Sequence, residues 1–492
     1  MHLPRVQVPR APDSPIGNGV VDAPPLEDKT FDENIAVNIP IGEEESLFSW
    51  RKLWAFTGPG FLMSIAYLDP GNIEADLQAG AQAEYKLLWI LLWSHVIGMV
   101  LQRMSARLGV VSGKHLAEIA YDYYPVVPRI GLWLMIELAI VCSDMQEVIG
   151  TAIAIYLLSK GNGCGKEEIV MAISIVGSVI MPHNFYLHSA LVKSRKVDRT
   201  SEKRVAEANK YFAIESAIAL FVSFFINLFV LSVFARGLYG KTNADVNQMC
   251  LAHDDIPDSD VFPNNTESVE VDLFEGGIYL GCQFGVAAMI IWAVGIFASG
   301  QSSTMTGTYT GQFVMEGFVK ISWPKWKRVL VTRAVAITPT LILTIKSNGI
   351  QNLTGMNDFL NCIQMVQLPF ALIPMITFTA SEKIMHDFKT SKSLQGFALI
   401  ASTIIIGINI YFIFETIAQH LGTEWYIFMA FIPVTIAYVV FVVYLSIYCL
   451  VACELIDEYV NIPGFDFQRP LKTNAPWLES LVRVPQLNQT YM

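Results

Sequence analysis

The sequence predicts an all-α integral membrane protein, and three observations support this. Hydrophobic residues make up 53% of the chain and charged residues only 16%, well below the roughly 25% charged share of soluble globular proteins. Several apolar runs approach or exceed the roughly 20 residues needed to cross the hydrocarbon of a bilayer. Two of these runs carry helix-breaking motifs beside polar residues, Asp69-Pro70-Gly71-Asn72 and Met181-Pro182-His183. The first two observations exclude a soluble domain, and the third indicates a site within the membrane.

Composition also limits the classes of partner that this protein can bind. A net charge of -11 argues against nucleic acid, whose phosphates attract basic proteins. The seven cysteines form no CxxC pair, so they carry no zinc or redox signature. Membrane lipid is the partner that the composition implies.

We predict ten membrane-spanning segments, preceded by a disordered cytosolic tail at residues 1–49 that lacks the apolar core of a signal peptide. The spans lie near residues 54–80, 87–101, 131–158, 169–191, 211–235, 277–299, 329–345, 359–380, 397–418 and 427–452, and the first and fourth are broken by proline. Lys and Arg gather in alternate loops, so the positive-inside rule places both termini in the cytosol. Residues 50–452 then form the transmembrane domain, and residues 453–492 form a second cytosolic tail.

The longest outward loop, residues 238–275, is strongly acidic and has Lys241 as its single lysine or arginine. Either it concentrates cations near an entrance, or it is simply a solvated, disordered loop. Asn264-Asn265-Thr266 within it is an N-glycosylation sequon. Cys164 and Cys250 would both face outward and could pair in a disulfide, although spacing alone does not establish the pairing.

The first proline break carries the residues best suited to an ion. Pro removes a backbone donor and Gly relaxes the chain, so the helix should unwind and its freed carbonyls can coordinate ions. Asp69 would be a carboxylate near mid-membrane, which costs several kcal/mol unless it is paired or hydrated. Asn72 adds a neutral oxygen, and the soft thioether of Met181 favours transition metals over calcium and magnesium. A methionine in an apolar helix is, however, also ordinary packing.

Two histidines follow the second break. His183 and His188 are five residues apart, which places them on different faces of a helix and excludes a metal clamp at i and i+4. Because imidazole titrates in the physiological range, we interpret them as proton-handling groups. The alternative is a pair of hydrogen-bonded core histidines.

The third span carries an acidic stripe. Glu137, Asp144 and Glu147 recur along one side of an otherwise apolar helix, where they need partners or water. Arg333, inside a later span, is a candidate partner. The stripe is therefore either a proton path or a charge network that determines helix packing.

Four segments resemble a known family. They are Asp69-Pro70-Gly71-Asn72-Ile73-Glu74, Ser143-Asp144-Met145-Gln146-Glu147-Val148-Ile149-Gly150, Ile180-Met181-Pro182-His183-Asn184 with Tyr186-Leu187-His188-Ser189, and Gly300-Gln301-Ser302-Ser303-Thr304-Met305-Thr306-Gly307-Thr308-Tyr309. Together they resemble the natural-resistance-associated macrophage proteins, proton-coupled divalent metal transporters. The last segment looks like the transport signature that this family carries in the loop after its eighth helix.

The resemblance implies a fold and a role for each residue. The fold would be of the leucine-transporter type, with two five-helix repeats of inverted topology that each begin with a broken helix. The implied metal ligands are Asp69, Asn72, Met181 and a backbone carbonyl near Ser178, with Asn361 as a polar neighbour from the tenth helix. The residues implied in proton movement are Asp144, Glu147, His183 and His188.

The chain departs from the family in length. Only residues 159–168 separate the third span from the helix that matches the family's sixth, so the fourth and fifth helices are absent. Losing an even number of helices preserves the orientation of everything downstream, which is why the positive-inside pattern still holds. The absence removes part of the scaffold and can expose polar groups to lipid.

The predicted function is proton-driven import of Fe²⁺ or Mn²⁺ into the cytosol, by a multi-pass protein of the plasma, endosomal or lysosomal membrane. It is not an enzyme and needs no cofactor. A second hypothesis is a transport-deficient form that acts as a regulatory or dominant-negative subunit. An amino-acid carrier is disfavoured, because a site for a substrate carboxylate needs free N-H groups rather than Asp69.

Overall fold

The computed structural model describes residues 37–39, 48–159, 181–251, 261–319, 354–420 and 425–457, together with several single positions. Ser178, Arg333 and Cys164 lie outside the described residues, as does most of the predicted span at 329–345.

The described residues are almost entirely helical. In the first part of the chain the helices are α1 (Trp50–Phe56), α2 (Pro59–Ile65), α3 (Pro70–Ala83), α4 (Leu88–Ser112), α5 (Leu116–Tyr123), α6 (Val126–Ser159), α8 (Pro182–Leu191), α9 (Glu202–Leu238) and α10 (Asn243–Cys250). In the second part they are α11 (Leu273–Phe284), α12 (Val286–Val319), α14 (Thr354–Gln367), α15 (Pro369–Ala380), α16 (Glu382–Met385), α17 (Lys392–His420) and α18 (Trp425–Ala452). The strands β1 (Val37–Asn38) and β2 (Arg195–Lys196) form a two-stranded parallel sheet.

Six stretches of the described helices are long and apolar enough to cross a membrane. They are Val126–Thr151, Glu202–Leu238, Val286–Val319, Leu360–Ala380, Lys392–Tyr411 and Ile432–Ala452. In Leu360–Ala380, 89% of the most apolar window is buried inside the protein, against 28–33% in the other five. This stretch, formed by α14 and α15, is therefore central, and the other five expose apolar faces as lipid-facing helices do.

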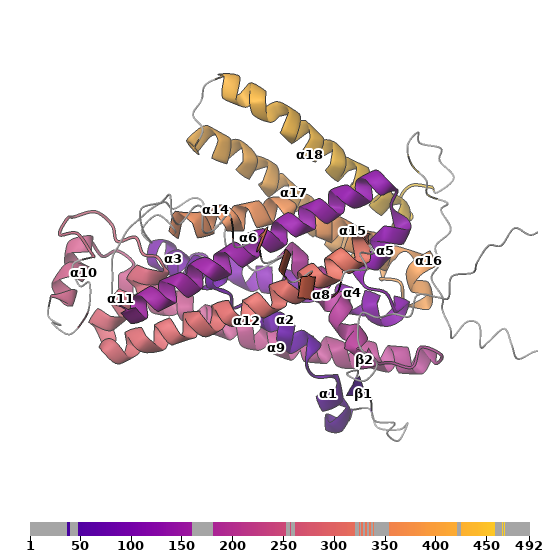
Figure 1. Ribbon diagram of the computed structural model, residues 1–492, viewed down its shortest axis with the longest axis horizontal. Helices are drawn as coiled ribbons and strands as arrows, with labels where there is room; N and C mark the ends of the chain where they lie inside the picture. The colour runs from indigo at the N-terminus through magenta and orange to yellow at the C-terminus, as the bar shows by residue number, and fades with distance from the viewer. Residues whose placement is uncertain are drawn as a thin grey trace, which may run out of the picture.

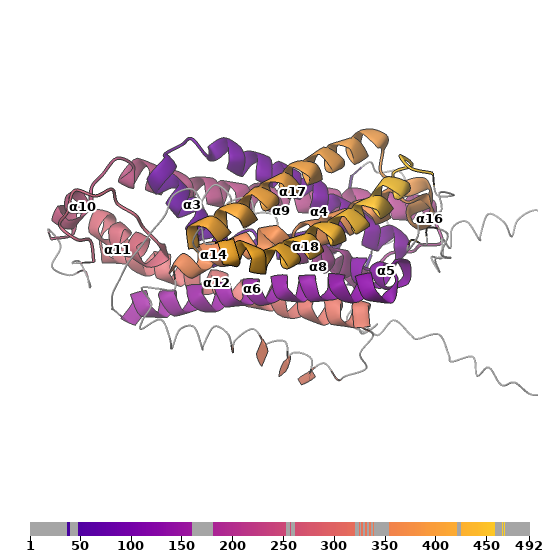
Figure 2. The same cartoon turned by 90° about the horizontal axis from the view of Figure 1, so that it is seen from above.

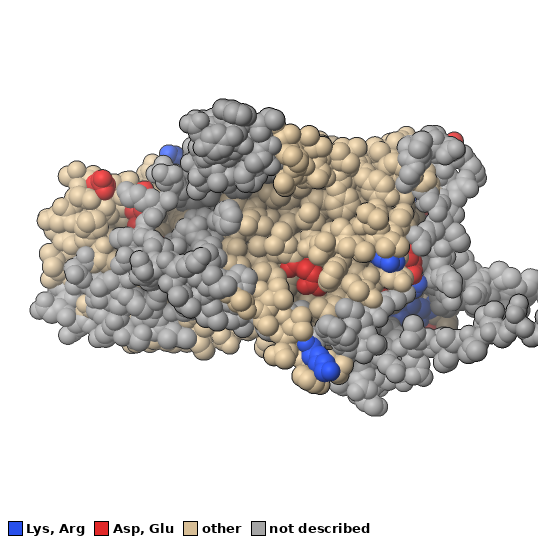
Figure 3. Space-filling view, turned by 45° about the horizontal axis from the view of Figure 1, so that its top comes forward, with Lys and Arg blue, Asp and Glu red and all other residues tan. Residues whose placement is uncertain are grey.

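The helices run roughly along the long axis of the molecule (Figures 1 and 2). α6 and α12 pack side by side along one face, α17 and α18 lie on one side of the bundle, and α1 and α9 lie on the other. α10 and α11 mark one end of the bundle, and α16 marks the other. On the face that Figure 3 shows, the described surface midway between these ends is largely uncharged, apart from a small acidic patch and a few single charges.

Both proline breaks occur where the sequence predicts them. α2 ends at Ile65 and α3 begins at Pro70, so the first span is two helices with a short link. α8 begins at Pro182, and the half of that span before it lies outside the described residues. Because proline is favoured at the first position of a helix, each break is also a helix start.

The predicted span at 277–299 is wrong in its extent. The structure has two helices there, α11 and α12, which are separated by Gly285 at φ 91°. That backbone conformation is one that glycine adopts without steric cost. α12 then continues to Val319, so the segment Gly300–Tyr309, which was expected in a loop, lies inside this helix.

The predicted pairing of Cys164 with Cys250 is also wrong, because Cys250 forms a disulfide with Cys282 across a Cα–Cα distance of 4.7 Å. The prediction placed Cys282 inside a membrane span. In the structure Cys282 belongs to α11, which packs against α10 at the same end of the bundle. The bond therefore joins α10 to α11.

Two segments expected to be disordered contain structure. In the acidic loop, α10 forms and Thr242 bridges to Ser268, while the sequon residue Asn264 is exposed. In the predicted N-terminal tail, Val37 and Asn38 pair with Arg195 and Lys196.

Candidate metal site at the break between α2 and α3

The link between α2 and α3 leaves three carbonyl groups without helical partners, and each accepts a hydrogen bond from a side chain. The bonds run from Asn72 Nδ2 to Ala66 O at 3.3 Å, from Asn227 Nδ2 to Tyr67 O at 3.0 Å, and from Ser299 Oγ to Leu68 O. Asn227 belongs to α9 and Ser299 to α12. The break is thus held open by two neighbouring helices, and each carbonyl oxygen keeps a second lone pair.

Asp69 and Asn72 form one unit at this break. Asp69 is the N-cap residue of α3, and its Oδ1 accepts from the Asn72 backbone N-H at 2.8 Å and from Asn72 Nδ2 at 2.6 Å. Because the Asn72 amide nitrogen is committed to Asp69 and Ala66, its oxygen must point the other way. Asp69 Oδ2 and Asn72 Oδ1 are both buried and have no hydrogen-bond partner in the described part of the chain. They are two free oxygens of the kind that bind cations.

Met181 occupies the second break. It precedes α8 in an extended conformation, with φ -78° and ψ 128°, and its side chain is 1% exposed. α8 packs against α2, where Leu187 and Ala190 share an apolar cluster with Met63 and Ala66. The two breaks therefore belong to helices in direct contact at the centre of the bundle (Figure 1).

Asn361 is connected to this site by hydrogen bonds that pass through Gln146 of α6. Gln146 Nε2 donates to Asn361 Oδ1 at 2.6 Å, and Gln364 Nε2 donates to Gln146 Oε1 at 2.5 Å. A Cβ added to Gly71 would lie only 2.8 Å from Gln146 Nε2 and 3.2 Å from Asn361 Oδ1. Glycine at this position lets α3 approach α6 and α14 closely, and the polar network lies directly against the break.

The acidic stripe of α6 divides into two parts. Asp144 and Glu147 are buried and face α12, since a Cβ at Gly307 would lie 2.5 Å from Asp144 Oδ1 and 3.6 Å from Glu147 Oε1. Glu137 instead accepts from Trp133 Nε1 at 2.9 Å. The structure brings Asp144 and Glu147 together at one glycine of the segment that resembles the transport signature, and it places Glu137 two turns away.

The two histidines of α8 are both buried, and their environments differ. His188 Nδ1 lies 2.7 Å from Gln102 Oε1 of α4, and His188 Nε2 lies 3.5 Å from Ser216 Oγ of α9. His183 Nδ1 has no hydrogen-bond partner in the described residues. His188 thus fits the hydrogen-bonded alternative, while His183 keeps a free nitrogen.

Sequence reasoning missed three buried polar side chains that belong to the broken helix or contact it. Glu215 of α9 accepts backbone N-H groups at the start of α2, Asn227 holds the link, and Asp76 is a buried acid of α3. A signal existed for two of them. Glu215 is a carboxylate inside a predicted apolar span, which by itself indicates function, and Asp76 follows Asp69 at i+7, on the same helix face.

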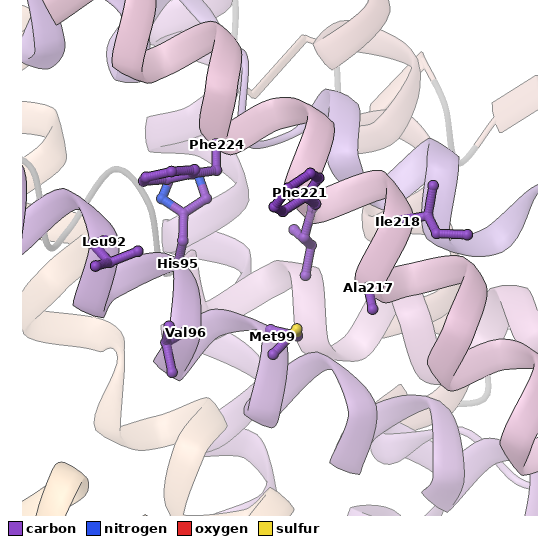
Figure 4. Close-up of a pocket in the computed structure, with 9 residues that line it drawn as sticks. Leu92, His95, Val96, Met99, Ala217, Ile218, Phe221 and Phe224 are labelled. Atoms are coloured by element: carbon purple, nitrogen blue, oxygen red, sulfur yellow. The ribbon is translucent and has the colours of Figure 1, made fainter.

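A hollow between α4 and α9 has a different, apolar lining. It is a cavity of about 440 Å³ lined by apolar side chains such as Met99 and Phe221, with His95 as its single polar residue (Figure 4). His95 Nδ1 donates to Leu91 O at 3.0 Å. In the described part of the chain, no group of three or more His, Cys, Asp or Glu residues is placed to hold a metal. The set of Asp69, Asn72 and Met181 contains only one residue of these four types, so it is not a group of this kind.

Comparison with known proteins identifies related chains. A family model described as natural resistance-associated macrophage protein-like matches residues 60–163 and 161–415. The NRAMP-like transporter smf-2 of Caenorhabditis elegans is 68% identical over 523 residues, which cover 93% of this chain and 96% of the relative. Natural resistance-associated macrophage protein 2 of Homo sapiens is 49% identical over 486 residues, covering 85% of each chain. The similarity extends over most of the chain.

A solved structure also matches. A crystal structure of the Eremococcus coleocola manganese transporter has a TM-score of 0.69 and 25% sequence identity, and the match covers 86% of this chain and 99% of that chain. The predicted all-α membrane fold of the leucine-transporter type is thereby confirmed.

Proposed function

This chain belongs to the natural resistance-associated macrophage protein family, and on that premise we propose that it imports Fe²⁺ or Mn²⁺ into the cytosol together with protons. It is a multi-pass membrane transporter and not an enzyme. The observation that carries the proposal is a pair of buried oxygens at the break between α2 and α3, Asp69 Oδ2 and Asn72 Oδ1, which have no hydrogen-bond partner among the residues that the structure describes.

Each ligand contributes separately to the choice of ion. Asp69 supplies the negative charge that attracts a divalent cation, and Asn72 supplies a neutral oxygen. The thioether of Met181 would add softness, which favours Mn²⁺ and Fe²⁺ over Ca²⁺ and Mg²⁺. The backbone carbonyl near Ser178 is proposed as a further ligand from the sequence resemblance.

Proton movement is proposed through the buried acids and histidines. Asp144 and Glu147 lie together between α6 and α12, and His188 links α8 to α4 and α9 through Gln102 and Ser216. These groups provide titratable positions on α8 and on the neighbouring helix α6. Glu137, His183 and Arg333 complete the set proposed from the sequence.

Replacing Asp69 tests the metal site. Asn is also a good helix N-cap, so Asp69→Asn should fold while losing the charge. Mn²⁺ binding and uptake should both fall at least about tenfold, equivalent to about 1.4 kcal/mol. Asp245→Asn, which changes an exposed acid in the first turn of α10, is the matched control and should bind normally. Undiminished Mn²⁺ binding by folded Asp69→Asn would place the ion elsewhere.

Replacing Met181 tests the selectivity. Met181→Ala should keep part of the Mn²⁺ uptake and make Ca²⁺ a better competitor, because only oxygen ligands remain. Met63→Ala removes another buried methionine, on α2, and should leave Ca²⁺ competition unchanged. If the two variants behave alike, the thioether plays no part in selection.

A transport-deficient form is the second candidate, because the chain is shorter than its relatives in one region. The alignment with smf-2 spans 523 residues and the chain has 492, so the relative contains residues with no counterpart here. The two parts of the family match meet at residues 161–163, where the fourth and fifth helices are predicted to be missing. Such a chain would keep the metal ligands and act as a regulatory or dominant-negative subunit.

Restoring the two helices after Leu158 separates these candidates. A completed scaffold should raise proton-dependent Mn²⁺ uptake, while both termini stay cytosolic and Asn264 stays outward and glycosylated. We propose the plasma, endosomal or lysosomal membrane as the location. Equal uptake by the short and restored chains would show that the missing helices are dispensable.

A further inference from the structure

Asp76 of α3 is a buried carboxylate for which the site described above has no use. Its side chain is 1% exposed, and it forms no hydrogen bond or ion pair within the described residues. Burying an unpaired charge costs several kcal/mol. A carboxyl group in this position is therefore either neutralised by a proton or paired with a bound cation.

Helix geometry aligns Asp76 with the residues of the metal site. Asp69, Asn72 and Asp76 stand at positions i, i+3 and i+7, which share one face of a helix. Each of the three keeps a buried oxygen without a hydrogen-bond partner among the described residues: Asp69 Oδ2, Asn72 Oδ1 and Asp76 Oδ2. With a rise of 1.5 Å per residue, Asp76 lies about 10 Å beyond Asp69 along α3, toward the α10 end. That separation is too large for one ion to be held by both carboxylates at normal ligand distances.

Other faces of α3 are in close contact with neighbouring helices. A Cβ on Gly150 of α6 would lie 2.3 Å from Pro70 Cβ, and one on Gly276 of α11 would lie 2.5 Å from Leu77 Cδ1. Gly71 lies against Gln146, as described above. The face that carries Asp69, Asn72 and Asp76 is buried as well, and it holds three acceptor oxygens without a hydrogen-bond partner among the described residues.

We propose that Asp76 is a second, outer binding position for the divalent cation, occupied before the ion reaches Asp69 and Asn72. The inference rests on the proposed function. With a carboxylate and water as its ligands, this position would bind Ca²⁺ and Mg²⁺ as readily as Mn²⁺. It would raise the local cation concentration and leave selection to the site that contains Met181. Weak binding suits an entry position, because the ion must also leave it.

The transport test uses Asp76→Asn in the full chain. Loss of the outer position should raise the KM for Mn²⁺ about threefold or more, with the maximal rate largely retained, and should weaken inhibition of uptake by Mg²⁺. Asp76→Glu should restore both properties. Glu74→Gln is the matched control, since Glu74 is a buried acid of the same helix on another face, where it accepts from Gln78 Nε2. If Asp76→Asn behaves like Glu74→Gln, Asp76 is a structural acid and the proposal is wrong.

Direct binding separates this proposal from the one on which it rests. Mn²⁺ titration of the purified chain should find one tighter and one weaker ion. Asp76→Asn should lose the weaker ion, and Asp69→Asn should lose the tighter one. If Asp69→Asn abolishes tight binding while Asp76→Asn leaves the stoichiometry unchanged, only the outer position is refuted. If Asp69→Asn changes nothing, the proposed metal site itself fails, whether or not the chain transports.

Discussion

α2 and α3 are the two halves of one broken helix, and they are held in place by different forces. α3 has 14 residues and is buried from Pro70 to Ala81. A Cβ on its Gly80 would lie 2.3 Å from Leu231 O and 2.8 Å from the Ala235 backbone nitrogen. α3 therefore packs backbone to backbone against α9, and its position is determined by shape.

α2 has only seven residues, four of them buried. Its N-terminal end is bound by Glu215, whose carboxylate accepts the N-H groups of Gly58 at 2.6 Å, Gly60 at 3.0 Å and Phe61 at 3.3 Å. Arg195 donates to Thr57 O at 2.5 Å and to Ala55 O at 2.9 Å. Charge-assisted hydrogen bonds thus hold the end of α2, and its detachment should cost less than moving α3.

The largest effect should come from filling the contact between α3 and α9. Gly80→Val puts side-chain atoms where backbone atoms of α9 stand, so we expect a loss near the upper end of the about 1–3 kcal/mol typical of overpacking. Thermal melting of the purified protein measures it. Gly295→Val in α12 is the control, because nothing lies within 4 Å of a Cβ at that glycine. If Gly80→Val and Gly295→Val melt at similar temperatures, shape does not determine the position of α3.

Glu215→Ala should lower the overall stability less than Gly80→Val does. It should, however, loosen α2 more. Three N-H groups lose a charged acceptor, and hydrogen bonds to charged groups contribute about 1.5–3 kcal/mol. A cysteine at buried Ser64 (Ser64→Cys) should then react faster with a thiol reagent, and Glu215→Gln should show part of the increase. The chain without Ser64→Cys gives the background. Unchanged reactivity would show that packing alone holds α2.

The smallest effect is expected from Arg195→Lys. Lysine keeps the charge but cannot reach both carbonyls with the planar arginine fork, so the loss should be about 0.5–1.5 kcal/mol, the value of an ordinary hydrogen bond. The same Ser64→Cys reaction measures it. Arg204→Lys alters a more exposed pair with Asp198 at 3.7 Å and should have no effect. If Arg195→Lys and Arg204→Lys change the thiol reactivity equally, Arg195 does not hold α2 in place.

Prediction from sequence succeeded where a local rule applied. Pro70 and Pro182 start helices, and Asp69 and Asn72 lie together, because proline placement and capping depend on neighbours within a few residues. It failed at Cys282, which was predicted to lie inside a membrane span and in fact pairs with Cys250. It also failed at Gly300–Tyr309, which was predicted to form a loop and in fact lies inside α12. Both errors concern helix limits, which apolar runs define only loosely.

The sequence by itself determined that the chain is a helical membrane protein with two proline breaks, because hydropathy and helix-breaking residues are local properties. The transition-metal ligands proposed from it stay a prediction. Only the tertiary structure decided which groups satisfy the break. Asn227 and Ser299 donate to the freed carbonyls from helices far away in the sequence. Gly150 of α6 and Gly276 of α11 pack closely against other faces of α3. Those contacts depend on how whole helices pack. Residue order alone could therefore not show that Asp69, Asn72 and Asp76 each keep an oxygen without a hydrogen-bond partner in the described part of the chain.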